Sequence, residues 1–190
     1  MIKELILKNR SYRRFFQPER ISVDLLREWV DLARNSASAR NAQPLKYIIS
    51  TDESFNAQLF EQLAWAGYLS DWYGPEEGER PSAYMIMLHD TTIAANYLCD
   101  DGIAAQSILL GAVEAGFGGC IIHAVNRKKI REILTLSEQF EIIQVLALGK
   151  PKEEVVLDEI KNGDVKYWRD GNQVHHVPKR PLDEIIVKVI

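Results

Sequence analysis

The segment Ser38-Ala39-Arg40-Asn41-Ala42-Gln43-Pro44 constrains this chain more than any other, because it separates an amphipathic helix from a β-strand. Pro44 cannot continue a helix, and it forces the residue before it towards extended geometry. The side chains of Asn41 and Gln43 each carry donors and an acceptor, which suits the polar edge of a flat heteroaromatic ring. The segment therefore predicts either a turn that contacts a ligand or an ordinary polar loop with a turn proline.

The spacing of apolar residues predicts the regular elements on either side of this segment. Helices are expected over residues 2–9, 23–35, 55–63, 101–116 and 127–134, and strands over 46–50, 83–89, 120–122 and 141–148. Ser22 and Asn126 are the expected N-caps of the second and the last of these helices, and Thr51 or Ser54 is the expected cap of the third. Gly116 is expected to end the most apolar helix.

A second segment, Asn9-Arg10-Ser11-Tyr12-Arg13-Arg14-Phe15, follows the first helix and is strongly basic. If this segment is extended, Ser11 and Arg13 point to one side while Tyr12 and Arg14 point to the other. Guanidinium groups and a hydroxyl that converge form a good phosphate site, because the arginine fork matches phosphate oxygens. The alternative is a solvated basic turn after a helix, where cations also suit the helix C-terminus.

The overall composition limits the classes of function. The net charge is −4 and the pI is near 5.6, which argues against a nucleic-acid binder. Cys99 and Cys120 form neither a disulfide framework nor a metal-ligand spacing, and they fit a reducing compartment. The N-terminus has no signal-peptide pattern and no apolar stretch is long enough to cross a membrane, so we expect a cytoplasmic protein. The 190 residues predict one domain.

Each of two further stretches is compatible with two structural interpretations. Residues 66–82 combine glycines and prolines with Tyr68, Trp72 and Tyr73, which predicts a loop whose aromatic rings either cover a flat ligand or form a satellite core. After Pro151 the chain is polar, with apolar islands only at 155–157 and 185–189. A tail of this length with little core of its own must pack on its own domain or on a second copy of the chain.

Taken together, the segments resemble the nitroreductase family of FMN-dependent flavoproteins over nearly the whole chain. The 9–15 segment is similar to the R-S-x-R-x-F signature of that family, and Ala37–Pro44 is similar to its P-S-x-x-N-x-Q-P signature. The apolar helix, the turn at 116–120, the Leu-Gly-Lys-Pro run at 148–151 and the basic run that begins at Lys179 resemble its later segments in the same order.

The resemblance implies an α+β domain with a central mixed or antiparallel sheet flanked by helices. It also implies a homodimer that binds FMN at the subunit interface, with residues 151–190 wrapping the partner and adding a strand to its sheet. By the same resemblance, NAD(P)H delivers a hydride to flavin N5, and a nitroaromatic, quinone or similar small oxidant removes it in a ping-pong cycle. No side-chain acid or base and no metal are expected to take part.

The site residues that the resemblance implies fall into three groups. Arg10, Ser11, Arg13 and Arg180 would hold the phosphate and the ribityl chain. Ser38, Asn41 and Gln43 would approach the ring, with Ser38 and Asn41 supplied by the other subunit. The backbone around Cys120, Ile121, Ile122 and His123 would line one face of the isoalloxazine, near N5.

The chain departs from the family pattern at four positions: Asn9, Ala37, Leu45 and His123. Of these, only His123 affects the expected chemistry, because an imidazole over the ring would position or exclude a substrate. A solvent-facing imidazole is the other reading of His123. The alternatives for the whole protein are an FMN enzyme with a non-nitro substrate, dehalogenase-like or flavin-fragmenting, an FMN-binding or storage protein, and a domain without flavin.

Overall fold

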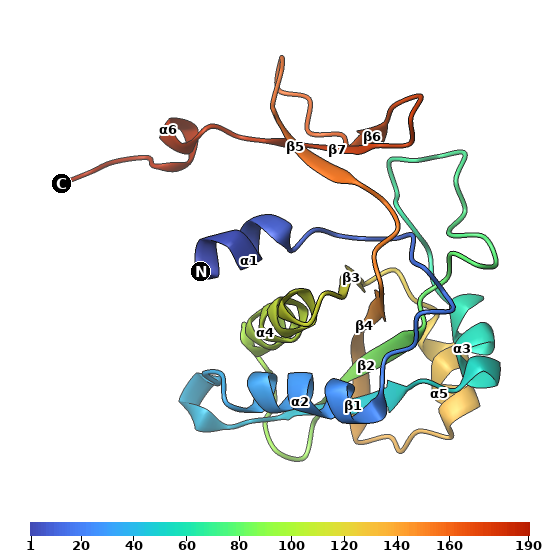
Figure 1. Cartoon of the computed structure of the whole chain (residues 1–190). Helices are drawn as coiled ribbons and strands as arrows, with labels where there is room; N and C mark the ends of the chain where they lie inside the picture. Colours follow the sequence, from blue (N-terminus) through green and yellow to red (C-terminus); the bar gives the residue numbers. More distant parts are fainter.

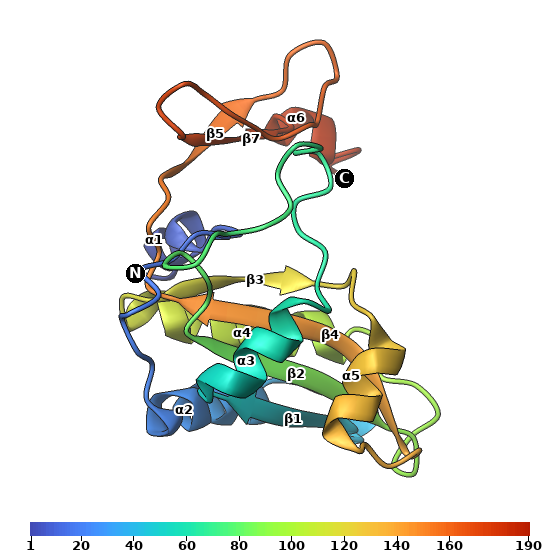
Figure 2. The same ribbon diagram turned by 90° about the vertical axis from the view of Figure 1, so that its right-hand side faces the viewer.

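The computed structural model describes all 190 residues, and its core is one antiparallel sheet buried on both faces (Figures 1 and 2). The strand order is β1-β2-β4-β3, and every neighbouring pair is antiparallel. The resemblance allowed a mixed or an antiparallel sheet, and the structure has the antiparallel one. The sheet strands are β1 Leu45–Ser50, β2 Ala83–Asp90, β3 Gly118–Ile122 and β4 Phe140–Gly149.

Helices cover the two faces of this sheet in pairs. The pair α2 and α4 packs on one face, and the pair α3 and α5 packs on the other (Figure 2). Because both faces are covered, all eight residues of β2 are buried, which explains its continuous apolar run. The main helices are α1 Ile2–Lys8, α2 Val23–Arg34, α3 Glu53–Phe60, α4 Asp100–Glu114 and α5 Arg127–Leu134, with a short 3-10 turn at Ala39–Asn41.

The helix ends follow the expected capping chemistry in two cases and depart from it in one. The Ser22 side chain accepts from the Leu25 N–H, and the Asn126 side chain accepts from the Lys129 N–H, as predicted. The cap of α3 is Asp52, whose carboxylate accepts from the Phe55 N–H, so the prediction of Thr51 or Ser54 was wrong. Thr, Asp and Ser can all cap a helix. Asp52 is the cap here because it directly precedes Glu53, the first residue of the helix.

Residues 66–82 contain no helix or strand, as expected, whereas the helix predicted over 55–63 lies at Glu53–Phe60 and ends three residues earlier. The indoles of this loop region belong to the core. Trp65 is buried, and both Trp65 and Trp72 pack in the apolar cluster between the sheet and the α3–α5 layer. Tyr68 packs against Tyr167 of the tail with tilted rings whose centres are 4.9 Å apart, and Tyr73 is almost fully exposed. This packing favours the satellite-core reading for the two tryptophans.

The tail after Pro151 forms a second, small sheet above the main body (Figure 2). Its strand order is β5-β7-β6, with β5 and β7 parallel and β6 antiparallel to β7. The last ten residues extend away from the body and are exposed throughout (Figure 1). The tail elements are β5 Val155–Glu159, β6 Trp168–Arg169, β7 His175–Lys179 and α6 Leu182–Ile185. None of the helices in the chain combines the length and the apolar character that a membrane span needs.

Candidate functional site

A cavity of about 260 Å³ lies between the basic 9–15 segment and the small tail sheet. It is lined by Asn9, Arg10, Ser11, Arg13, Tyr167, His175, Val177 and Lys179. Ser11 and Arg13 share this cavity, while Arg14 turns away to Glu79, which is the alternation predicted for an extended segment. Three of the lining residues are cationic at neutral pH and none is acidic, so the cavity suits an anion.

The two arginines of the cavity have unused donors. The Arg10 Nη2 donates to the Ile6 carbonyl at 2.7 Å, whereas its Nε is buried without a partner. The guanidinium of Arg13 makes its hydrogen bonds through Nη1, to the Ser11 carbonyl at 3.2 Å and with His175 Nε2 at 3.3 Å. Its Nε and Nη2, which form the other edge of the fork, remain free to grip an oxyanion.

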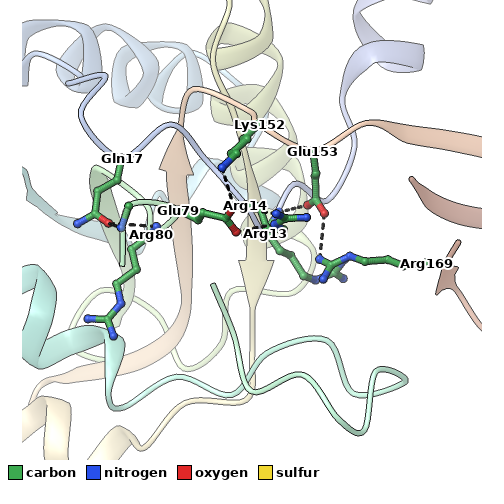
Figure 3. Close-up of polar contacts among 9 residues, drawn as sticks. Arg13, Arg14, Gln17, Glu79, Arg80, Lys152, Glu153 and Arg169 are labelled. Atoms are coloured by element: carbon green, nitrogen blue, oxygen red, sulfur yellow. Dashed lines mark hydrogen bonds and ion pairs between the residues drawn. The ribbon is translucent and has the colours of Figure 1, made fainter. Parts of the chain in front are cut away.

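A buried ion pair fixes the backbone of Arg13 (Figure 3). The carboxylate of Glu153, which is completely buried, accepts from the Arg13 N–H through one oxygen. Its second oxygen accepts from Arg169 Nη2 at 3.0 Å, and the Arg169 guanidinium lies 4.2 Å from the centre of the Trp72 ring. The tail and the 66–82 loop thus hold the basic segment in place.

A second ion cluster joins the far end of that loop to the same basic segment (Figure 3). Glu79 accepts from Arg14 Nε at 2.6 Å and from Arg14 Nη2 at 2.7 Å, and Lys152 Nζ lies 2.8 Å from Glu79 Oε1. Hydrogen bonding to Arg14, reinforced by Lys152, lowers the pKa of Glu79 to about 2. Backbone bonds from Phe15 to Glu79 and from Gln17 to Gly78 add to this attachment.

The turn after α2 is locked by a buried carboxylate. Asp100, at the start of α4, accepts from the Ser38 hydroxyl at 2.6 Å and from the Ala39 N–H at 2.8 Å. The Gln43 N–H in turn donates to the Ser38 oxygen at 2.9 Å, and the Gln43 amide donates to Asn41 Oδ1 at 3.1 Å. Both Asn41 and Gln43 have positive φ, near 55°, so the turn is backbone-strained and rigid. Gln43 therefore does not take the extended geometry expected of the residue before Pro44, because its N–H and its amide are held by Ser38 and Asn41.

This turn opens on a different cavity, of about 420 Å³, between α2, β1 and the start of α4. Its polar lining includes Ser38, Gln43, Lys46 and Asp100. The two cavities share no lining residue, and α4 separates them, with α1 on one side of it and α2 on the other (Figure 1). One copy of the chain therefore does not bring the 9–15 segment and the 38–44 turn together.

The strand β3 lies directly against the basic segment. The Tyr12 N–H donates to the Gly119 carbonyl at 3.1 Å, and Ser11 pairs with Gly119 as an isolated bridge. Cys120 and Ile122 are buried in the core, whereas Ile121 and His123 are exposed. Burial raises the pKa of the Cys120 thiol to about 12, which makes it inert. The start of β3, at Gly119, thus lies beside Ser11 of the anion cavity.

The tail strand β7 contributes to the cavity in a way that the sequence did not predict. Alternation along β7 places His175, Val177 and Lys179 on the cavity side. Arg180, the tail residue implied by the resemblance, lies past the strand, does not line the cavity and pairs with Glu184 on the surface. Lys179 is the cation of this tail segment that lines the cavity, and the role of Arg180 towards a phosphate stays a prediction. No three His, Cys, Asp or Glu side chains gather as a metal site requires.

Comparison with known proteins identifies the family. The sequence profile described as "Nitroreductase family" matches residues 6–150, which is most of the chain.

The chain belongs to the nitroreductase family.

Individual relatives agree with this assignment. A protein of Archaeoglobus fulgidus named "Putative NADH dehydrogenase/NAD(P)H nitroreductase" is 24% identical over 159 residues, covering 80% of this chain and 86% of that protein. The crystal structure of a nitroreductase family protein from Streptococcus pneumoniae TIGR4 matches with a TM-score of 0.70 at 19% identity and covers both chains fully. An FMN-dependent nitroreductase from Clostridium difficile R20291 matches with a TM-score of 0.67 at 20% identity, covering 100% of this chain and 98% of that one. The fold is therefore the nitroreductase fold.

Proposed function

We propose that this nitroreductase-family protein is an FMN-dependent NAD(P)H oxidoreductase that reduces nitroaromatics, quinones or similar small oxidants. The observation that carries the proposal is the anion cavity, in which Arg10, Arg13 and Lys179 converge on a space without a single carboxylate. The names of the relatives, which include an NAD(P)H nitroreductase and an FMN-dependent nitroreductase, support the redox chemistry.

The residues of the cavity fit a phosphate monoester. The Nε and Nη2 edge of Arg13 is free for a bidentate contact, and the Ser11 hydroxyl and the Lys179 ammonium add further donors. The cavity volume of about 260 Å³ exceeds that of a phosphate group, which leaves room for the first part of a ribityl chain. A ligand whose phosphate binds here can continue towards β3, because Ser11 of the cavity pairs with Gly119 of that strand.

Strand β3 would lie along the flavin ring in this arrangement. Its backbone is held against the 9–15 segment by the Tyr12–Gly119 hydrogen bond, and Ile121 and His123, which follow Gly119, are exposed. Bound FMN would supply two-electron hydride chemistry between NAD(P)H and the oxidant. The protein would bind and orient the ring, and the exposed His123 would border the space that a substrate enters.

A second copy of the chain would complete the site. Ser38, Asn41 and Gln43 lie on the far side of α4 from the cavity, so their expected approach to the ring requires a partner subunit. The exposed apolar residues at the C-terminus, among them Leu182, Ile185 and Val187, support a dimer in which this segment packs on the partner.

Flavin titration of the apo-protein tests the proposal. Arg13→Ala is expected to weaken FMN binding by about 1.5–3 kcal/mol, because it removes a charge-assisted phosphate contact. Riboflavin, which lacks the phosphate, should bind both proteins equally. Arg20→Ala is the matched control, since Arg20 is an exposed arginine that pairs with Glu53 and does not line the cavity.

The redox part of the proposal has its own measurement. The FMN-loaded protein should be bleached by NADH or NADPH under anaerobic conditions and should recover its colour with a nitroaromatic or a quinone. Bleaching without recovery by any such oxidant would point to an FMN enzyme with another substrate, and binding without bleaching would point to a storage protein. A colourless protein that ignores added FMN would overturn the proposal.

A further inference from the structure

His175 is a residue of the anion cavity that neither the family signatures nor the basic segments indicate. It is the first residue of β7, its side chain is 1% exposed, and its Nε2 lies 3.3 Å from Arg13 Nη1. The ring also packs on Tyr167, with centres 5.2 Å apart, and Tyr167 in turn lies 4.9 Å from the Arg13 guanidinium. His175 and Tyr167 thus enclose one side of the arginine.

The chemistry of the contact fixes the protonation of the imidazole. A guanidinium has only donors, so His175 Nε2 must be the acceptor in the bond with Arg13 Nη1. The ring is therefore neutral and carries its proton on Nδ1, which is buried without a partner. Burial, and after it the charges of Arg13, Arg169 and His176, lower the pKa of His175 to about 4, which agrees with a neutral ring at pH 7.

We propose that His175 is a positioning residue for the phosphate-binding arginine. Its Nε2 and the Ser11 carbonyl both hold Nη1 of Arg13, and the Tyr167 ring supports the guanidinium. With Nη1 held, Nε and Nη2 are left as a preformed fork for an oxyanion in the cavity that Arg13 lines. This inference rests on the proposed function, because it assigns the phosphate of the flavin to the same cavity. It places part of the cofactor site in the tail of the same chain.

Preorganisation explains why a contact from His175 to Arg13 would raise the affinity for a phosphate. A free arginine side chain loses rotamer freedom when it binds an oxyanion, and a fork that is already held loses less. Removing the acceptor on β7 should therefore weaken the binding of ligands that carry a phosphate. It should leave the binding of the same ring system without phosphate unchanged.

The test compares FMN with riboflavin on apo-protein variants. His175→Ala is expected to lower the affinity for FMN by roughly three- to tenfold, the equivalent of one ordinary hydrogen bond, with riboflavin affinity unchanged. His175→Gln, which offers a side-chain carbonyl to Arg13, should restore most of the loss. His176→Gln is the matched control, since His176 lies on the other face of β7, bonds to Asp158 and stacks on Trp168.

The outcomes separate this inference from the proposed function. If the wild-type protein binds FMN no better than riboflavin, the phosphate assignment of the cavity is wrong. If the preference for FMN is present and His175→Ala retains it, only the role of His175 is wrong. Nitrogen-15 NMR of the wild-type imidazole at pH 7 gives an answer that does not depend on variants that fold: a proton on Nδ1 supports the inference, and a proton on Nε2 overturns it.

Discussion

Replacing Glu79 with glutamine removes the carboxylate that Arg14 and Lys152 share, and with it the anchor of the 66–82 loop. Arg14 grips Glu79 with two hydrogen bonds, and both side chains are mostly buried, with exposed fractions of 20% and 17%. Neutral glutamine offers Arg14 one carbonyl oxygen in place of two charged ones. The variant therefore leaves a largely buried guanidinium underpaired.

The expected size of the effect comes from the pKa of Glu79. Arg14 and Lys152 lower it from 4.5 to about 2, and a difference of that size corresponds to at most about 3.4 kcal/mol of folding free energy. Glu79, Arg14 and Lys152 are each partly exposed, so water screens their charges. The expected contribution to the folding free energy is therefore about 2 kcal/mol. A lowered pKa means that the stabilisation is complete above the unfolded value of about 4.5 and is lost as the pH falls towards 2.

Urea unfolding at pH 7, 5 and 3 measures this effect. Glu79→Gln should lower the free energy of unfolding by about 2 kcal/mol at pH 7, and the difference from the wild type should shrink by roughly half between pH 5 and pH 3. Glu77→Gln is the control, because Glu77 is exposed on the same loop and forms no ion pair. A difference that stays the same across this pH range would refute an ion-pair origin.

Three further predictions concern the core, the thiols and the C-terminus. Gly119→Ala should cost about 1–3 kcal/mol in thermal or urea unfolding, because the new Cβ would lie 2.3 Å from the Ala147 carbonyl oxygen. Iodoacetamide at pH 8 should modify the exposed Cys99 and spare Cys120 until the protein is denatured, and equal labelling of both in the native state would contradict the burial of Cys120. For the proposed dimer, a chain that ends at residue 180 should keep its fold and sediment as a monomer, whereas an unchanged dimer would exclude the exposed C-terminal residues as an interface.

Local sequence signals were sufficient for most of the secondary structure. The serine and asparagine caps and the apolar stripes of α2 and α5 act within one or two turns, so their effect can be read without knowing the fold. The same holds for the opposite directions of Arg13 and Arg14, which follow from the geometry of an extended segment. The cap of α3 was mistaken because Thr51, Asp52 and Ser54 compete within four residues, and only the start of the helix selects Asp52.

The composition of the candidate site was predictable only in part. The basic 9–15 segment and the 38–44 turn stand out in the sequence, but nothing in it indicates that Asp100 would lock the turn or that Glu153 would hold the Arg13 backbone. These contacts join residues 62 and 140 positions apart, so they exist only once α4 and the tail are packed.

The sequence by itself determined the family and the approximate positions of the helices and strands of the main body, and it indicated the basic 9–15 segment, because these depend on neighbouring residues and on short motifs. The tertiary structure alone decided which tail residue joins the cavity. Alternation along β7 turns Lys179 inwards with His175, and the end of that strand leaves Arg180 on the surface with Glu184. Which side chains of a strand point to a given side depends on the strands with which it pairs and on the residue at which the pairing ends. For β7 these are β5 and β6, and the pairing with β5 ends at Lys179.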